Sequence, residues 1–375
     1  MRLLWSISLT SPTGATIQAE LIAKKLVESG IEVYFLHFPM SDLPISQSVI
    51  DTYRDPPVVY PFEGFSETVE AVDPDVVVLH TIDPTILPEL ERVRANYPVA
   101  TRIGLNLLEV SMFPNLSPLL PNFIRIILSS DVVICSGKNV MEQMKGLGVP
   151  EERLYYIPTA IDPSAYQLSE GRDPTILVMG RLSPVKNLLT ALEAFNLLKR
   201  KLPEAEMAIA GMGDPKPLNA IIEAMELEDC KYVGYFPDPN LLFKEVSILL
   251  LPSLSENLPQ SVLEAYACGV PCVISDCGWS REFLAPVKVP PDAPDQIAKS
   301  LLRLLEDRDY WREVRERQLK ELSRYDINEV IPKYISLFED LKEAGRYFSH
   351  QDEDVKRRLR ELGVRVREHR GGESR

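Results

Sequence analysis

Two glutamates, Glu256 and Glu264, stand eight residues apart in the segment 249–276, which reads LLLPSLSENLPQSVLEAYACGVPCVISD. Glu256 follows an aliphatic run typical of a buried strand, and Glu264 falls in a stretch whose apolar positions recur at helical spacing. An ionised carboxylate only accepts hydrogen bonds and can take two hydroxyl donors at once, so it suits the vicinal diol of a ribose or a sugar ring. The pair therefore predicts a site that binds a carbohydrate or a nucleoside.

Three elements must hold these two carboxylates in place. The sequence predicts a strand over 247–251, a helix over 259–269 and a second strand over 271–275. In such a βαβ unit ligands bind beyond the carboxyl ends of the strands, so both carboxylates are expected to face a ligand crevice. In the alternative interpretation Glu256 only solvates a loop and Glu264 lies on an exposed helix face. The flanking pattern of strand, loop and helix favours the ligand site.

Two cations follow another predicted strand, at 175–180. Arg181 comes directly after this strand, and Lys186 is expected in the first turn of the next helix. A helix N-terminus with two cations would hold a diphosphate and stabilise the charge that builds on it when a glycosidic bond to phosphate breaks. In the alternative interpretation Lys186 is an ordinary solvated residue and Arg181 belongs to a structural ion pair. The diphosphate site is favoured, because a lysine in the first turn opposes the helix dipole unless an anion is present.

The composition limits the class of protein. The chain has 375 residues, more than the ~250–300 that a single core supports, so two domains are expected. Aliphatic strands that alternate with helices indicate α/β domains with parallel sheets. A net charge of -14 argues against nucleic-acid binding, which needs Lys and Arg to neutralise phosphates. No apolar run is long enough for a signal peptide or a membrane span, so a soluble cytoplasmic protein is expected.

The alternation of strands and helices is interrupted once. Before the interruption, Gly14 forms a turn that leads into an amphipathic helix; this suits an anion or a polar ligand, although a glycine that simply lets the chain turn is equally expected. The segment 158–172 is rich in Pro, Ser, Asp and Gly, which predicts an interdomain linker. A second alternation begins at Thr175, and helices close the chain over 295–344. The stretch 351–375 is highly charged and is expected to dock weakly or to be disordered.

Four motifs occur in order in the second half of the chain. They are GRLSPVKN at 180–187, AGMGDPKP at 210–217, YVGYFPD at 232–238 and PSLSENLPQSVLEAYACGVPCVISD at 252–276. With them the chain resembles the retaining glycosyltransferases of family 4. The resemblance implies an α/β GT-B fold, in which two facing Rossmann-like domains have a ligand cleft between them and a nucleotide-sugar binds in that cleft.

The resemblance also implies the domains. Residues 1–160 would form an N-terminal Rossmann-like acceptor domain, 161–172 a linker, and 173–327 a C-terminal Rossmann-like nucleotide-sugar domain. A helix over 328–344 would return to the N-terminal domain, and 345–375 would form a charged tail.

By the same likeness, the second domain holds most of the donor. Arg181 and Lys186 would bind its diphosphate, and Glu264 its ribose. Glu256 would bind the transferred sugar, so Arg181, Lys186 and Glu256 are the residues expected to take part in catalysis.

The other donor contacts implied by the resemblance are made by the backbone and by loops. The backbone of Asn257 and Leu258 would help to bind the transferred sugar. The loop of Tyr235 and Phe236 would hold the base, and Gly14 would line the cleft from the first domain.

The first domain departs from the family pattern. Many relatives carry a histidine at the end of the strand that corresponds to 98–103, where it contacts the transferred sugar, and this chain has Gly104 at that point. Asn106, Glu109 and His80 are candidates to replace it. For each of these three residues, a purely structural role is expected at least as strongly as contact with the transferred sugar.

The function implied by the resemblance is transfer of a sugar, expected to be a hexose, from a nucleotide-diphosphate sugar to a sugar, lipid or small-molecule acceptor with retention at the anomeric carbon. No cofactor and no metal are expected, because the two cations already serve the diphosphate and no Asp-x-Asp motif lies at a strand end. The partners expected are the nucleotide-sugar and an unknown acceptor, with no nucleic acid and no membrane span, while peripheral membrane contact stays open. The alternative is a catalytically weak nucleotide-sugar binding or regulatory protein on the same fold. A nicotinamide enzyme is disfavoured, because Lys216 stands where a dinucleotide fingerprint needs its third glycine.

Overall fold

The chain folds into two compact units. The computed structural model describes residues 1–7, 14–37, 58–59, 64–80, 86–103, 120–171 and 173–348. The N-terminal unit comprises Met1–Pro158 together with the segment from Val330 onward, and the C-terminal unit comprises Thr159–Glu329.

The N-terminal unit is built on a parallel sheet, which has seven strands within the described residues, in the order β3-β2-β1-β4-β5-β6-β7. The strands are β1 (Arg2–Ile7), β2 (Glu32–His37), β3 (Val58–Val59), β4 (Val76–Leu79), β5 (Val99–Ile103), β6 (Val132–Cys135) and β7 (Leu154–Tyr156). Central strands such as β4, with the sequence VVVL, are apolar throughout because both faces of a parallel sheet are covered and every residue is buried. The strand order reverses between β1 and β4, as it does in doubly wound sheets.

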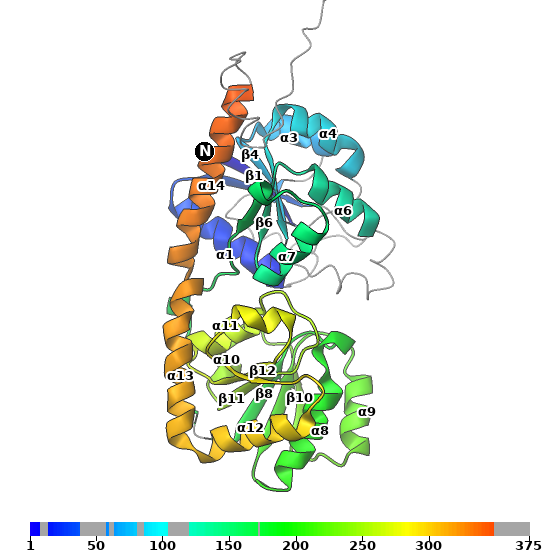
Figure 1. Cartoon of the computed structure of the whole chain (residues 1–375), viewed down its shortest axis with the longest axis vertical. Helices are drawn as coiled ribbons and strands as arrows, with labels where there is room; N and C mark the ends of the chain where they lie inside the picture. The colour runs from blue at the N-terminus through cyan, green and yellow to red at the C-terminus, as the bar shows by residue number, and fades with distance from the viewer. Residues whose placement is uncertain are drawn as a thin grey trace, which may run out of the picture. The chain divides into compact units, whose positions relative to one another are not determined.

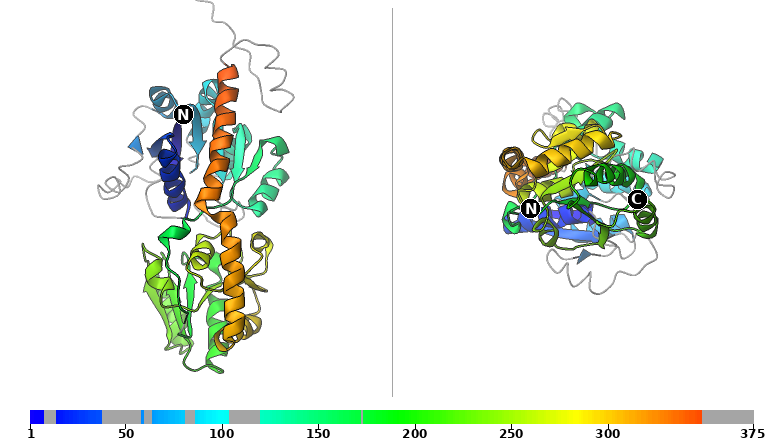
Figure 2. Two further views of the ribbon diagram at one scale, coloured as in Figure 1. Left: turned by 90° about the vertical axis from the view of Figure 1, so that its left-hand side faces the viewer. Right: turned by 90° about the horizontal axis from the view of Figure 1, so that it is seen from below.

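Helices cover both faces of this sheet (Figure 1). They are α1 (Gly14–Glu28), α3 (Phe65–Val72), α4 (Leu87–Asn96), α6 (Leu120–Ser129), α7 (Lys138–Gly146) and α14 (Ile327–Phe348). On one face α3, α4, α6 and α7 pack in two clusters of buried apolar side chains. On the other face lie α1 and α14 (Figure 2), where the Trp5 ring packs on Tyr334 and Phe338 with centroid distances of 6.3 and 6.2 Å.

The last helix returns to the first unit. The sequence predicts it over 328–344, and α14 runs from Ile327 to Phe348, so that it starts in the C-terminal unit and continues in the N-terminal unit. Lys342 Nζ on α14 donates to Asp75 Oδ2 at 2.8 Å, just before β4. Residues 349–375, which make up most of the predicted charged tail, lie outside the described residues.

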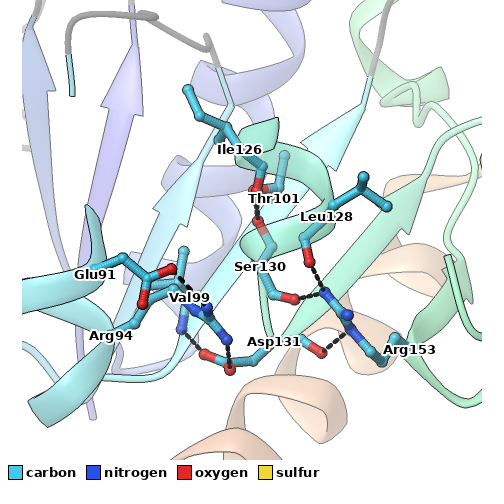
Figure 3. A network of polar contacts seen from close by, with 9 residues as sticks. All are labelled: Glu91, Arg94, Val99, Thr101, Ile126, Leu128, Ser130, Asp131 and Arg153. Carbon is cyan, nitrogen blue, oxygen red and sulfur yellow. Dashed lines mark hydrogen bonds and ion pairs between the residues drawn. The ribbon is translucent and has the colours of Figure 1, made fainter. Parts of the chain in front are cut away.

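A polar network supports the amino-terminal edge of the same sheet (Figure 3). Asp131, just before β6, accepts hydrogen bonds from Val99 N at 2.8 Å and from Arg94 Nη2 at 3.0 Å. Arg153 Nη2 donates to Leu128 O at 3.0 Å, near the end of α6, where a cation is favoured by the helix dipole. Because ligands bind at the opposite edge of such sheets, this network serves the alignment of β5 and β6.

The C-terminal unit repeats this architecture. Its sheet has six parallel strands in the order β10-β9-β8-β11-β12-β13. The strands are β8 (Thr175–Met179), β9 (Glu206–Ala210), β10 (Cys230–Gly234), β11 (Ile248–Leu251), β12 (Cys272–Ser275) and β13 (Val287–Val289). The order reverses between β8 and β11, which makes the carboxyl ends of these two strands the expected place for a ligand.

The helices of the C-terminal unit also form two layers (Figure 1). They are α8 (Leu188–Lys199), α9 (Lys216–Ala224), α10 (Asn240–Phe243), α11 (Gln260–Ala267), α12 (Pro294–Glu306) and α13 (Arg308–Leu322), with short 3-10 turns η4 (Pro163–Ala165), η5 (Pro184–Lys186), η6 (Gly278–Glu282) and η7 (Ser323–Tyr325). One cluster of buried side chains joins α10 and α11 to the sheet, and the other joins α8, α9 and α12. Each unit is thus a Rossmann-like α/β domain, as the sequence predicts.

The segment predicted as an interdomain linker, 161–172, is fastened to the C-terminal unit over its described residues. Ile161 pairs with Asp326 in a parallel bridge. Further along, Ser169 N donates to Cys268 O at 2.8 Å. The composition of the segment predicts a linker between the domains, whereas these contacts tie its described residues to the second unit.

In the part of the chain that the structure describes, no helix combines the length and the apolar character that crossing a membrane requires.

Candidate functional site

The candidate site lies where the strand order of the C-terminal sheet reverses, at the carboxyl ends of β8 and β11. The loop after β8 carries Arg181 and Lys186, and the loop after β11 carries Glu256. The two loops are in direct contact, since Leu254 N donates to Val185 O at 2.8 Å. The predicted cations and the predicted carboxylate therefore lie at the same edge of one sheet.

Asn187 joins the loops of the site. Its Nδ2 donates to Pro252 O at 3.3 Å and to Pro291 O at 3.0 Å, in the loops that follow β11 and β13. Its φ of 53° is left-handed, a conformation that asparagine adopts more readily than most residues. The chain turns at this residue, so Lys186 ends the 3-10 turn η5, and α8 begins only at Leu188. The expectation that Lys186 lies in the first turn of the helix is therefore corrected.

Lys186 and Glu256 form an ion pair between these two loops. Their side chains are 16% and 11% exposed, so the pair is largely removed from water. Gly180 makes room for it, because a Cβ at this position would lie 2.8 Å from Lys186 Cε. Arg181, in the same loop, has an exposed side chain. The site thus offers cations beside a carboxylate, which matches a ligand that has a phosphate next to sugar hydroxyls.

Glycines hold the β8 loop against the loop that follows β9. Gly180 N donates to Ala210 O at 2.9 Å, and Leu182 N donates to Met212 O at 2.7 Å. Gly211 has a φ of +143°, and a Cβ there would lie 1.9 Å from Gly180 O. The AGMGDPKP motif therefore permits the backbones of the two loops to approach closely, a role that the sequence pattern alone did not reveal.

Glu264 is buried on α11, with 6% of the residue exposed. Burial raises the pKa of this carboxyl to about 7, and a hydrogen bond from Gln260 opposes the rise. The alternative in which Glu264 lies on an exposed helix face is therefore wrong. The helix begins at Gln260, one residue after the predicted start, with Pro259 as its N-cap. A proline fits there because the first N–H groups of a helix have no partner inside it.

The other residues predicted to bind the donor differ in their environment. Asn257 and Leu258, in the loop that leads to α11, are buried with exposed fractions of 9% and 5%. Tyr235 is 41% exposed and Phe236 is half-buried. These two aromatic residues follow β10, the edge strand of the sheet, and so lie on the far side of β9 from the ion pair.

Of the residues predicted to act from the N-terminal unit, Gly14 and His80 lie within the described part of the chain. Gly14 is the first residue of α1 and is exposed, and a Cβ at this position would meet nothing within 4 Å. Gly104, Asn106 and Glu109 lie outside the described residues.

His80 is buried inside the N-terminal unit. Trp5 Nε1 donates to its Nδ1 at 3.1 Å, and Arg102 Nη1 lies 3.2 Å from its Nε2. Burial, together with the positive charge of Arg102, holds the pKa of the imidazole well below its usual value, so the ring is neutral.

Sequence reasoning missed the buried Arg102. It is 1% exposed and donates from Nε to Tyr334 OH at 2.7 Å, on α14. Among the described residues, its Nη2 has no hydrogen-bond partner. The available signal was an arginine in the middle of β5, whose sequence is VATRI and whose five residues, Arg102 included, are all buried.

Among the residues that the structure describes, no group of three or more His, Cys, Asp or Glu could hold a metal ion. All five cysteines are free thiols. Cys277, just after β12, is half-buried, and its Sγ lies 3.8 Å from Ser253 O. Burial raises the pKa of this thiol to about 11. This thiol is therefore protonated at neutral pH.

The sequence of the C-terminal unit matches a known family. Residues 164–321 match "Glycosyl transferases group 1". The chain is 29% identical over 176 residues to the N,N'-diacetylbacillosaminyl-diphospho-undecaprenol alpha-1,3-N-acetylgalactosaminyltransferase of Campylobacter jejuni, covering 46% of each chain. It is 30% identical over 175 residues to the amylovoran biosynthesis glycosyltransferase AmsK of Erwinia amylovora, covering 43% of each chain. The alignments thus span less than half the length of these curated relatives.

Solved structures match nearly the whole chain. The Anabaena protein HepE, in complex with UDP and glucose, aligns with a TM-score of 0.77 and 17% identity over 91% of this chain and 100% of that chain. Sucrose-phosphate synthase from Thermosynechococcus elongatus aligns with a TM-score of 0.74 and 13% identity over 92% of this chain and 100% of that chain. These likenesses show the fold and confirm the predicted GT-B class with its two Rossmann-like domains. Residues 164–321, inside the C-terminal unit, therefore match the glycosyl transferases group 1 family, in a chain that has a GT-B fold.

Proposed function

We propose that this chain is a retaining glycosyltransferase, which moves a sugar from a nucleotide-diphosphate donor to a sugar, lipid or small-molecule acceptor. The observation that carries the proposal is the ion pair of Lys186 and Glu256 at the switch point of the C-terminal sheet. A cation for phosphate and an acceptor for sugar hydroxyls are adjacent there, inside the segment that matches the glycosyltransferase family.

Each of the charged residues has a distinct task in this proposal. Lys186 and the exposed Arg181 bind the diphosphate, and they stabilise it further as it gains charge on leaving the sugar. Glu256 accepts hydrogen bonds from hydroxyls of the transferred sugar. Glu264, in its ionised form, accepts two hydrogen bonds from the ribose diol.

Retention follows if the acceptor attacks on the face that the diphosphate leaves. The departing phosphate oxygen can then take the proton of the acceptor hydroxyl, so the protein needs no general base. The pair of opposed carboxylic groups that glycoside hydrolysis requires is accordingly not part of the proposal. Because Arg181 and Lys186 supply positive charge to the diphosphate, metal independence is also proposed.

The relatives support this assignment and suggest the kind of acceptor. One is named for transfer of N-acetylgalactosamine onto a sugar carried by diphospho-undecaprenol, and another for biosynthesis of amylovoran. An acceptor that already carries a sugar, either on a lipid or in a growing polysaccharide, is therefore proposed. The solved complex of HepE holds UDP, which makes UDP-sugars the first donors to test.

The test is to incubate the purified chain with UDP-, GDP- and ADP-sugars in the presence of EDTA. We expect slow release of free sugar from one donor, initially with the anomeric configuration of the donor, as seen by NMR. Lys186→Ala should lower turnover about 100-fold and lower donor affinity less, since the diphosphate gains charge only in the transition state. Glu223→Gln, a change on the exposed face of α9, is the matched control.

Two outcomes would contradict the proposal. Release of the inverted anomer would exclude retention. A donor that stabilises the fold, by ~2.7 kcal/mol at 100 times its dissociation constant, but is never turned over with any acceptor would indicate a nucleotide-sugar binding or regulatory protein.

A further inference from the structure

Arg102 is a buried cation that has no opposite charge beside it among the described residues. It is 1% exposed, and its Nε donates to Tyr334 OH at 2.7 Å, which is a neutral group. Within the described part of the chain it forms no ion pair, and its Nη2 has no hydrogen-bond partner. An arginine cannot lose its proton to relieve burial, and buried charges in proteins are normally paired. The guanidinium therefore offers unused donors and an uncompensated positive charge.

The imidazole of His80 adds a further donor. Trp5 Nε1 donates to His80 Nδ1 at 3.1 Å, and because an indole nitrogen can only donate, Nδ1 is the acceptor. In the neutral ring the proton then lies on Nε2. This Nε2 is 3.2 Å from Arg102 Nη1, so two N–H groups face each other and neither can accept from the other. An acceptor atom that hydrogen-bonds to both would relieve this contact.

These donors lie at the edge of the N-terminal sheet where ligands bind in doubly wound folds. The strands β4 and β5 pair in register at Leu79 and Thr101. His80 and Arg102 are the next residues along these two segments, toward the carboxyl ends of the strands. The strand order reverses between β1 and β4, and Trp5 comes from β1. The cluster therefore occupies the switch point of the sheet, and all of its residues belong to the N-terminal unit.

We propose that Arg102 and His80 form a binding site for an oxyanion, either a free ion or a phosphate or carboxylate group of a larger ligand. Two oxygens of such a group match the planar fork of the guanidinium, and one of them also accepts from His80 Nε2. Trp5 and Tyr334 orient the two donors through the hydrogen bonds described above. The proposal does not rest on the proposed function, because the diphosphate site assigned there lies in the C-terminal unit.

The chain has three tryptophans, which provide a direct test. The indole of Trp5 contacts His80, whereas that of Trp279 donates to the loop after β11, next to the candidate donor site, and that of Trp311 to the residue before β11. The protein is labelled with ¹⁵N-tryptophan and titrated with sodium phosphate, with sodium chloride keeping the ionic strength constant. Trp→Phe variants assign the three indole signals.

We expect the Trp5 signal to shift and saturate while the Trp311 signal stays in place. The dissociation constant should be on the order of 1 mM, as for about two hydrogen bonds to a charged group. A shift of the Trp279 signal alone would mean that phosphate binds only in the C-terminal unit, and it would overturn the proposal. The absence of a saturable Trp5 shift up to about 50 mM phosphate would do the same.

Variants of Arg102 test whether the guanidinium is responsible. Arg102→Met removes the charge and should abolish the Trp5 shift. Arg102→Lys keeps the charge but not the fork, and it should bind phosphate about tenfold more weakly than wild type. Arg125→Met is the matched control, because it removes the same charge from an exposed position on α6 in the same unit and should leave the affinity unchanged. Wild-type affinity in both Arg102 variants would contradict the proposal.

Two further probes distinguish the source of the oxyanion. If methyl phosphate shifts the Trp5 signal as inorganic phosphate does, the site admits a phosphate group of a larger ligand; if inorganic phosphate alone does so, the ligand is the free ion. A shift with acetate would extend the site to carboxylates. These measurements need no donor and no turnover, so they decide the role of Arg102 even if the chain transfers no sugar.

Discussion

The ammonium of Lys186 and the carboxylate of Glu256 are paired across the two loops at the switch point of the C-terminal sheet. In the absence of a donor, the cation proposed for the diphosphate is thus neutralised by the carboxylate proposed for the transferred sugar. A diphosphate that reaches Lys186 competes with Glu256 for the same ammonium. The donor sugar offers hydroxyls to Glu256 in exchange, which a bare nucleotide cannot do.

This competition predicts opposite effects of Glu256→Gln on binding and on turnover. The variant keeps the shape of the side chain but removes its charge, so Lys186 becomes available to a diphosphate. We expect the affinity for the bare nucleoside diphosphate to rise about fivefold, close to the ~1 kcal/mol of a partly screened ion pair. Sugar transfer should fall, because the acceptor for the sugar hydroxyls is weakened. Calorimetry with the nucleotide and turnover of its sugar derivative measure the two effects.

The control for this prediction is again Glu223→Gln, which removes a negative charge from an exposed position on α9 and so matches the change in net charge. Its affinity for the bare nucleotide should equal that of wild type. An unchanged or lower affinity in Glu256→Gln would mean that the ion pair does not compete with the diphosphate.

The ion pair also predicts an asymmetry in stability. Lys186→Met leaves Glu256 largely buried without its cation and should lower the free energy of unfolding by about 3 kcal/mol, whereas Lys186→Met combined with Glu256→Leu should restore most of the loss. Lys299→Met is the control, because its i,i+4 pair with Asp295 on α12 is 79% and 61% exposed and should contribute less than about 0.5 kcal/mol. Denaturant unfolding gives these values. A double variant as unstable as the single one would indicate that the loops need the pair itself.

Much of this fold could be predicted from the sequence, because the strands of parallel sheets are continuous aliphatic runs separated by amphipathic helices. The βαβ rule also placed Glu256 and the β8 loop at one edge of the sheet. It could not reveal that Lys186 pairs with Glu256, because that contact joins residues 70 positions apart. The position of Lys186 ahead of α8 depends on the left-handed Asn187, which helix propensity does not anticipate.

Two other features depend on distant contacts. The composition of 161–172 indicates a linker. However, Arg315 Nη1 donates to Ser169 O at 2.8 Å, although the two residues lie 146 positions apart in the sequence. Arg102 is an arginine in the middle of a buried strand, and arginine is rarely buried unless it is paired. Both the contacts of the 161–172 segment and the burial of Arg102 are determined by tertiary packing, which a local sequence pattern does not contain.

The burial of Glu264 predicts a pH dependence of stability. The folded-state pKa is raised to about 7 from an ordinary value of 4.5, so between these values the folded protein binds a proton that the unfolded chain does not. Stability contributed by the protonated carboxyl is therefore full below about pH 4.5 and is lost as the pH rises through 7. Glu264→Gln should accordingly unfold at a higher temperature than wild type at pH 8, by about 3 kcal/mol in free energy, and at nearly the same temperature at pH 4.5.

The same variant should bind the nucleotide more weakly at pH 8, since an amide replaces the double acceptor of the ribose diol. Thermal unfolding at several pH values and calorimetry provide the two readouts. If Glu264→Gln were no more stable than wild type at pH 8, burial would not destabilise the ionised form of the Glu264 carboxyl.

Substitution of Gly211 tests the close approach between the loop that follows β8 and the loop that follows β9. Its φ of +143° and the 1.9 Å that would separate a Cβ from Gly180 O mean that alanine fits only if the two loops move apart. Gly211→Ala should therefore lower the free energy of unfolding by about 3 kcal/mol or more, and it should weaken nucleotide binding because Lys186 is carried by the loop that must move. Gly278→Ala is the control in the same unit, since a Cβ there would meet nothing within 4 Å. If both variants behaved like wild type in denaturant unfolding and in nucleotide affinity, the close approach at Gly211 would be dispensable. Loss of affinity in Gly211→Ala alone would show that the glycine serves the donor site through the backbone of its neighbour, without touching the ligand.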